Sequence, residues 1–97
     1  AVVKAVETTD QCLKQVMETA KAEGYSVVVI ADHGNADLAR NDDGTPHTAH
    51  TTNPVPIWVH GPEETKVSDG ILADVAPTIL RLMNLSQPPE MTGQSLV

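Results

Sequence analysis

Aromatic residues are scarce in this sequence: one Trp, one Tyr and no Phe occur among 97 residues. Any core must therefore be aliphatic, built from Val, Ile, Leu, Met and Ala side chains. Cysteine is scarcer still, because Cys12 stands alone. A single cysteine excludes an internal disulfide and fits a reducing compartment, so we expect a cytoplasmic location.

Basic residues are also few. Six Lys and Arg stand against 13 Asp and Glu, which gives a formal net charge of −7. This balance argues against a nucleic-acid partner and against an anionic membrane surface, because both need an excess of Lys and Arg. No apolar run approaches the roughly 18 residues of a membrane span, and no signal peptide is visible. We therefore expect neither nucleic-acid nor membrane binding.

Apolar residues recur at helical spacing from Val2 to Ala20, so we expect a helix that runs to about Glu23 and stops at Gly24. Cys12 falls on or near the apolar stripe, where we expect an inert core residue. The chain opens without Met and already inside this helical pattern. Such a start favours a piece of a longer protein.

Two short apolar runs predict strands. Residues 26–31, SVVVIA, show no alternation, which is typical of a strand covered on both faces in a parallel sheet. Residues 55–60, VPIWVH, predict a second strand. Residues 72–84 predict a helix with Asp74 as N-cap. The order helix–strand–loop–strand–helix indicates part of an α/β layered fold, with few strands for a complete one.

Potential metal ligands cluster in the loop between the strands. Three of the four histidines lie between positions 33 and 50. Asp32 and His33 follow the first strand, where functional loops of α/β sheets lie, and Gly34 permits a tight turn. His50 closes the loop just before the second strand, so the returning chain can bring it beside His33. A carboxylate with imidazoles suits a divalent metal such as Zn²⁺ or Mn²⁺.

Simpler interpretations stand beside this one. Asp-His-Gly is also an ordinary turn, and His47 and His50 are each compatible with plain loop residues. His60 follows an apolar run and favours a structural role. Asp42 and Asp43 precede Gly44 and indicate a solvated turn.

A resemblance takes in the whole chain. ADHGNAD followed by HTAHTTNPVP resembles the C-terminal part of the cofactor-independent (2,3-bisphosphoglycerate-independent) phosphoglycerate mutases, metal-dependent members of the alkaline phosphatase superfamily. The segments LADVAPTILRLMNL and EMTGQSLV are similar to the last helix and closing segment of that family, and AVETTDQCLKQV to the preceding helix.

The resemblance implies a partial three-layer α/β/α alkaline-phosphatase-like fold, with two main helices packed on a small, mostly parallel sheet. Residues 1–97 would be a single domain, the C-terminal part of the phosphatase-like metal-binding domain. The N-terminal part of that domain and the inserted transferase domain would lie outside this sequence.

The resemblance also implies an activity. The family interconverts 3-phosphoglycerate and 2-phosphoglycerate through a phosphoserine, at a site with two Mn²⁺ ions for which Zn²⁺, Co²⁺ or Mg²⁺ can substitute. Asp32 and His33 match the ligands of the metal that holds the serine. His50 matches a ligand of the other metal, whereas His47 matches a position that is not a ligand.

The departures from the family bear on activity. None of the serines in this chain matches the family's nucleophile, so no catalytic residue is assigned here. The remaining metal ligands and the substrate-binding arginines also lie outside the sequence. We expect the chain to be inactive alone and to self-associate through uncovered surfaces, although the parent is expected to be a monomer. Two alternatives stay open: a fragment of a phosphopentomutase or metal-dependent phosphatase, or a non-catalytic metal-binding module.

Overall fold

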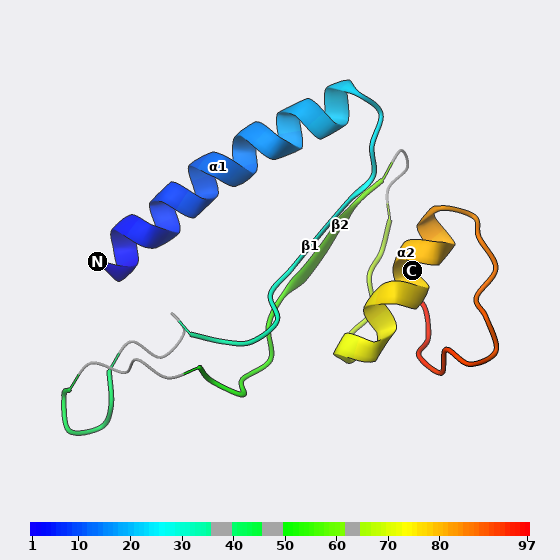
Figure 1. The fold of residues 1–97 in the computed structure, drawn as a ribbon. Coiled ribbons are helices and arrows are strands. Elements are labelled where there is room, and N and C mark those ends of the chain that lie inside the picture. The colour runs from blue at the N-terminus through cyan, green and yellow to red at the C-terminus, as the bar shows by residue number, and fades with distance from the viewer. Residues whose placement is uncertain (36–39, 46–49, 62–64) are drawn as a thin grey trace.

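The computed structural model describes residues 1–35, 40–45, 50–61 and 65–97. In chain order the described elements are α1 (Val2–Ala22), β1 (Val27–Ile30), β2 (Ile57–His60), the 3₁₀ turn η1 (Leu72–Asp74) and α2 (Val75–Leu82). The helix–strand–loop–strand–helix order predicted from the sequence is therefore confirmed. Figure 1 shows α1 and α2 on opposite sides of the paired strands.

The helix α1 ends where the sequence predicts. Gly24 takes a positive φ of 78°, which costs glycine little. Its N–H donates to the carbonyl of Lys21, and the N–H of Tyr25 donates to the carbonyl of Ala20. These two bonds form a Schellman motif, which satisfies carbonyls that the last helical turn leaves open.

The sheet differs from expectation in strand direction. The strands β1 and β2 pair antiparallel, with Val27 opposite His60 and Ile30 opposite Ile57. A mostly parallel sheet is therefore not confirmed by the strands that the structure describes. A loop is enough to turn the chain back into an antiparallel partner, whereas a parallel partner needs a crossover, usually a helix. No element is described between these two strands.

Both faces of this strand pair are apolar. Directly opposed residues of an antiparallel pair share a face. Val28 and Ile30 therefore lie with Val59 and Ile57 on one face, whereas Val27 and Val29 lie with His60 and Trp58 on the other. Such a sheet needs a layer on each side, and this explains why the run at 26–31 lacks alternation.

The C-terminal segment forms a small unit around α2. Thr78 is fully buried; its hydroxyl donates to the carbonyl of Asp74 at 2.7 Å and accepts from the N–H of Leu96 at 2.9 Å. Asp74 stands at the N-cap of α2, as predicted, but its carboxylate accepts from the backbone N–H groups of Ile71 and Gln94. These bonds tie the closing segment to the start of the helix.

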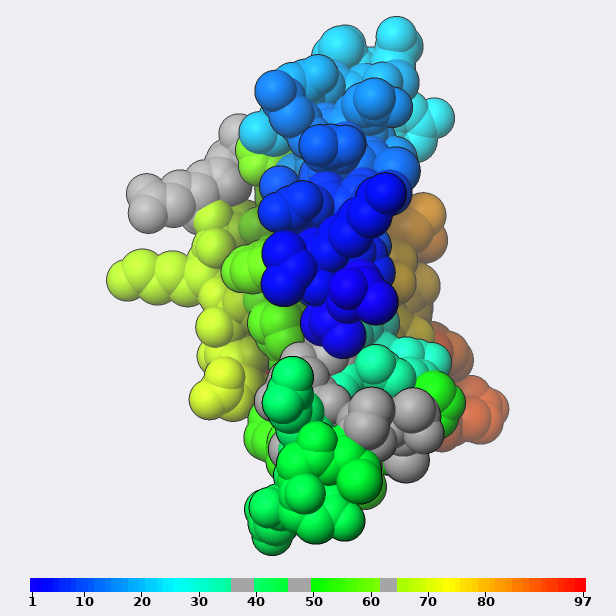
Figure 2. Space-filling model, turned by 90° about the vertical axis from the view of Figure 1, so that its left-hand side faces the viewer, coloured from blue at the N-terminus to red at the C-terminus, as the bar shows by residue number. Residues whose placement is uncertain are grey.

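Little of the chain is buried. Among the described residues, Leu96 is the hydrophobic residue in the core, and α1 buries none of its residues. The radius of gyration is 16.2 Å, whereas a compact domain of this length has about 12.5 Å. Figure 2 shows α1 on the outside of the molecule, across the upper part of the face turned to the viewer. The expectation of two main helices packed on the sheet therefore overstates the contact that α1 makes.

The prediction that Cys12 is a core residue is wrong, since its side chain is exposed. It lies at the margin of the apolar stripe of α1, which has little packed against it here. No helix in the described ranges is both long enough and apolar enough to cross a membrane.

Candidate metal centre

The site lies where the chain leaves β1. Asp32 and His33 follow the strand directly, and Gly34 is buried. Gly34 pairs with Thr51 in an isolated antiparallel bridge. The N–H of Thr51 donates to the carbonyl of Gly34 at 2.7 Å, and the N–H of Gly34 donates to the carbonyl of Thr51 at 3.2 Å. Both ends of the long loop are thus held together just beyond the strands.

The bridge brings two of the predicted ligands together. The ring centroids of His33 and His50 are 3.7 Å apart, and the ring planes are inclined by 33°. His33 is partly buried and His50 is exposed. The loop therefore returns as the sequence predicts, although the ligand roles of these residues stay a prediction.

Asp32 and His33 converge at their polar atoms. Asp32 Oδ1 lies 3.4 Å from His33 Nε2, and 84% of the Asp32 side chain is exposed. The other ring nitrogen of His33, Nδ1, is 3.0 Å from the carbonyl oxygen of Gly34. Each contact suits an N–H on the ring nitrogen that makes it, because the Gly34 carbonyl and the Asp32 carboxylate are both acceptors. Both ring nitrogens of His33 therefore have an oxygen acceptor nearby.

This donor pair fits a divalent metal in type and spacing. Bonds of about 2.0–2.2 Å to a tetrahedral ion put neighbouring donor atoms about 3.3–3.6 Å apart. The separation of 3.4 Å between Asp32 Oδ1 and His33 Nε2 is of that size. The number of donors is insufficient, because no three His, Cys, Asp or Glu side chains in the described ranges form a group able to hold a metal. His47 and Asp37 lie outside the described residues.

The acidic turn in the loop is a separate feature. Asp43 Oδ1 accepts from the hydroxyl of Thr45 at 2.6 Å and from its N–H at 3.0 Å. The hydroxyl bond first, and the backbone bond second, lower the pKa of Asp43. Gly44 has a φ of 86° and donates its N–H to the carbonyl of Asn41. The solvated turn predicted around Gly44 is confirmed, since its residues are exposed and bond to one another.

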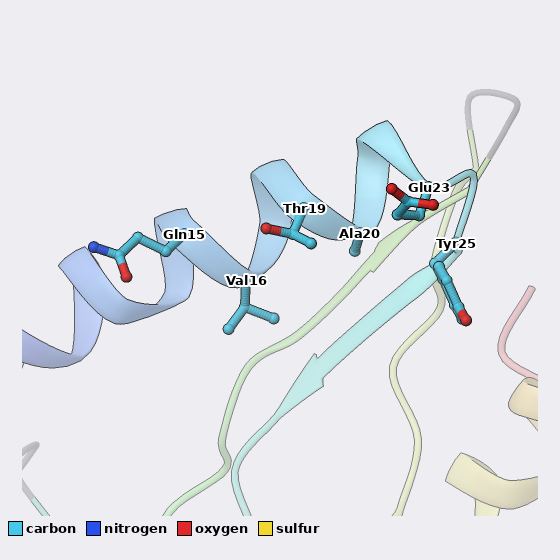
Figure 3. A pocket seen from close by; sticks show the side chains of 6 residues that line it. All are labelled: Gln15, Val16, Thr19, Ala20, Glu23 and Tyr25. Carbon is cyan, nitrogen blue, oxygen red and sulfur yellow. The ribbon is translucent and has the colours of Figure 1, made fainter.

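Two open hollows flank the sheet. One is a groove between the strand ends and the η1–α2 unit, and Asp32 and His33 line it. The other lies beside α1 and Tyr25 (Figure 3), where Val16 and Ala20 point to the side on which the strands run. Among the residues that line this second hollow, the ionisable ones are Glu23 and Tyr25. Of the two, the groove at the strand ends carries the candidate chemistry.

Gly34 and Thr51 have a role that the sequence pattern did not indicate. Each directly follows a histidine, and their pairing is what sets the two rings side by side. The sequence does hold a hint of this pairing. Gly34 and Thr51 each come directly after a histidine, at the two ends of the same loop, and residues at the two ends of a loop are candidates for an antiparallel bridge.

The chain is similar to a known family and to several curated proteins. The family model described as the Metalloenzyme superfamily matches residues 1–87. The chain is 59% identical over 98 residues to the 2,3-bisphosphoglycerate-independent phosphoglycerate mutase of Parabacteroides distasonis. It is 57% identical over 98 residues to the protein of the same name from Bacteroides fragilis, and 46% identical over 107 residues to that from Nostoc punctiforme.

Each of these matches covers 100% of this chain but only 19 or 20% of the relative. The chain thus spans about a fifth of the length of the curated relatives that it matches. The superfamily match takes in both helices, both strands and the loop with Asp32, His33 and His50. The chain therefore belongs to the Metalloenzyme superfamily, whose fold is the alkaline-phosphatase-like α/β type.

Proposed function

We propose that this chain is the C-terminal part of the phosphatase-like domain of a 2,3-bisphosphoglycerate-independent phosphoglycerate mutase. In the complete protein it contributes Asp32, His33 and His50 to a two-metal site, with Mn²⁺ as the expected ion. The observation that carries the proposal is the convergence of Asp32 Oδ1, His33 and His50 beyond β1, at the residues that resemble the mutase motif. The identity of 59% over the whole chain supports it.

The chemistry of the reaction defines what these residues must do. A phosphoryl group leaves one hydroxyl of the glycerate for a serine hydroxyl, and then returns to the neighbouring hydroxyl. Bound divalent ions would lower the pKa of that serine and offset charge on the transferred group. Asp32 supplies a carboxylate oxygen, and His33 supplies Nε2, the ring nitrogen that lies beside it. His50 supplies a second imidazole from the opposite end of the loop.

The chain alone is proposed to be inactive. It supplies no matching serine nucleophile, and in the described ranges no three ligands form a metal site. Its small core also leaves the loop with little support. The proposed parent acts on phosphoglycerate, a small molecule, in the cytoplasm and as a monomer.

The test is a Mn²⁺ titration by calorimetry of the chain, of its Asp32→Ala and His50→Ala variants, and of the full-length protein that contains it. We expect weak or undetectable binding by the chain and clear binding by the full-length protein. In the full-length protein either substitution should lower metal affinity by about 10-fold or more, and mutase activity with it.

His60→Ala is the matched control, because His60 lies opposite Val27, at the end of the strand pair away from Asp32 and His33. It should leave metal affinity unchanged. Tight binding by the isolated chain, abolished by both substitutions, would instead identify a self-sufficient metal-binding module. Mutase turnover by the purified chain would contradict the proposed inactivity.

A further inference from the structure

We propose that the proline segment, residues 53–56 (NPVP), is a positioning element: it ends the pairing of β1 and β2, and this lets the neighbours Asp32 and His33 turn toward each other. The importance of that turn for metal binding rests on the proposed function. The backbone geometry itself concerns residues that the structure describes and does not depend on a bound metal.

The two strands change their alignment before they reach the isolated bridge. The pairing of β1 and β2 ends with Ile30 opposite Ile57, and the next pair along the chain is Gly34 with Thr51. Three residues join these two points on the β1 side, whereas five join them on the β2 side. All of these connecting residues are described, and none of them pairs with a strand. Such a mismatch breaks the pairing in the manner of a β-bulge, a feature that is common beside active sites.

The break matters because Asp32 and His33 are adjacent in the chain. Successive side chains of a regular strand point to opposite faces of the sheet. Continued pairing in the β1–β2 register would put Asp32 opposite Val55 and leave His33 on the other face. Instead, Asp32 Oδ1 lies 3.4 Å from His33 Nε2. Adjacent side chains converge in this way where the backbone leaves strand geometry, so the break is a condition for the ligand pair.

Two prolines explain why the pairing stops at Ile57. Pro56 directly precedes β2, and Pro54 lies two residues before Pro56. Proline fixes φ at about −65°, whereas an antiparallel strand has about −140°, and proline has no N–H to donate. Both prolines are exposed, so what they supply is restraint of the backbone rather than core packing. The strand therefore begins at Ile57, although the apolar run predicts a strand from residue 55.

The proline segment and the predicted ligands also share one space. Pro54 and Pro56 line the groove at the strand ends together with Asp32 and His33. If pairing extended through the proline segment, the backbone of residues 31–33 would join the sheet and the turn at Asp32 and His33 would be lost. The prolines thus act on the site through the backbone opposite it.

The experiment compares two double substitutions in the full-length protein that contains this chain. Pro54→Val with Pro56→Val restores both N–H groups and introduces a residue that favours strands. Pro54→Gly with Pro56→Gly restores the same N–H groups but disfavours strands. If the prolines end the pairing, the valine pair should be the more harmful. If they only stiffen the loop, the glycine pair should be, because glycine leaves the unfolded chain the most freedom.

Two measurements start from metal-free protein: amide hydrogen exchange over residues 31–33 by mass spectrometry, and a Mn²⁺ titration by calorimetry. In the valine pair we expect slower exchange than in the wild type, because pairing extends across these residues, and a Mn²⁺ affinity lower by about 10-fold or more. In the glycine pair exchange should not become slower, and the affinity should fall less. Pro89→Val, in an exposed turn beyond α2, is the matched control and should change neither.

Unchanged or faster exchange over residues 31–33 in the valine pair would overturn the proposal, as would a larger loss of Mn²⁺ affinity in the glycine pair. If the valine pair does not fold, Pro56→Val and Pro56→Gly are compared by the same two measurements and judged in the same way. Slower exchange in the valine pair of a full-length protein that neither binds Mn²⁺ nor has mutase activity would support the positioning and refute the proposed function.

Discussion

At the residue scale, individual polar side chains carry much of the order that the structure has. Thr78 is the clearest case, because a hydroxyl with no exposed surface joins the first turn of α2 to the last residues of the chain. Gly93 contributes in a different way, by a close backbone approach, since a Cβ at this position would collide with the carbonyl oxygen of Ala73. Such contacts depend on chain segments that are distant in the sequence.

Thr78→Val should destabilise the C-terminal unit by about 1–3 kcal/mol, because the N–H of Leu96 loses its acceptor while the side chain keeps its shape. Urea unfolding and amide exchange at Leu96 measure this. Thr9→Val is the matched control: Thr9 makes the same bond to the carbonyl four residues earlier, but at an exposed position. It should change stability by less than about 0.5 kcal/mol. Equal effects of the two substitutions would argue against the role of burial.

Gly93→Ala should also weaken the docking of the closing segment, by about 1–3 kcal/mol, because the methyl group forces either this backbone or that of Ala73 to shift. The same urea experiment measures it. Thr92→Ala, at an exposed neighbouring position, should have little effect. A Gly93→Ala variant as stable as the wild type would mean that the close approach is not maintained in solution.

At the element scale, the ends of the helices follow local rules closely. Gly24 ends α1 in a Schellman motif, and Asn84, with a φ of 57°, ends α2 in the same way. The start of α2 is different, because the carboxylate of Asp74 binds the N–H groups of Gln94 and Ile71 rather than those of its own helix. That junction therefore depends on the charge of Asp74.

The pKa of Asp74 is lowered by its hydrogen bonds from the backbone N–H of Gln94 and, second, of Ile71. A carboxyl whose pKa is lower in the folded than in the unfolded chain stabilises the fold above its unfolded value of about 3.9. This stabilisation is lost as the pH falls through the lower folded value. The urea midpoint of the wild type should therefore fall on acidification below about pH 4, and that of Asp74→Asn should fall less.

Asp43→Asn serves as the control for that titration, because the bonds of Asp43 stay within its own turn and do not reach the closing segment. A parallel decline in wild type and Asp74→Asn would show that other carboxyl groups dominate the acid sensitivity.

At the scale of the whole molecule, the chain is extended, at 49 × 34 × 19 Å, and leaves large apolar side chains exposed. On α1 these include Val2, Val6 and Val16, which are 43, 54 and 60% exposed. Both faces of the β1–β2 pair are apolar. Its residues are therefore those of a sheet with a layer packed on each face, but the described residues do not cover these faces fully. This agrees with a chain that spans about a fifth of its relatives.

The isolated chain should therefore self-associate, with a weight-average mass that rises with concentration in sedimentation velocity. Val6→Glu should reduce the association, because it places a charge on the exposed apolar stripe of α1. Gln11→Glu adds the same charge on the opposite face of this helix and should have a smaller effect. A chain that stays monomeric up to about millimolar concentration would contradict the expectation.

The sequence by itself determined the elements and their limits to within a few residues, because helix periodicity, apolar runs and glycine stops act over short distances. It also indicated Asp32, His33 and His50 as ligands, through their places at the two ends of one loop. Only the tertiary structure decided the antiparallel pairing of β1 and β2, the exposure of Cys12 and the bridge between Gly34 and Thr51. Strand direction, burial and ring contact depend on how distant segments meet in space, and no local pattern specifies that meeting.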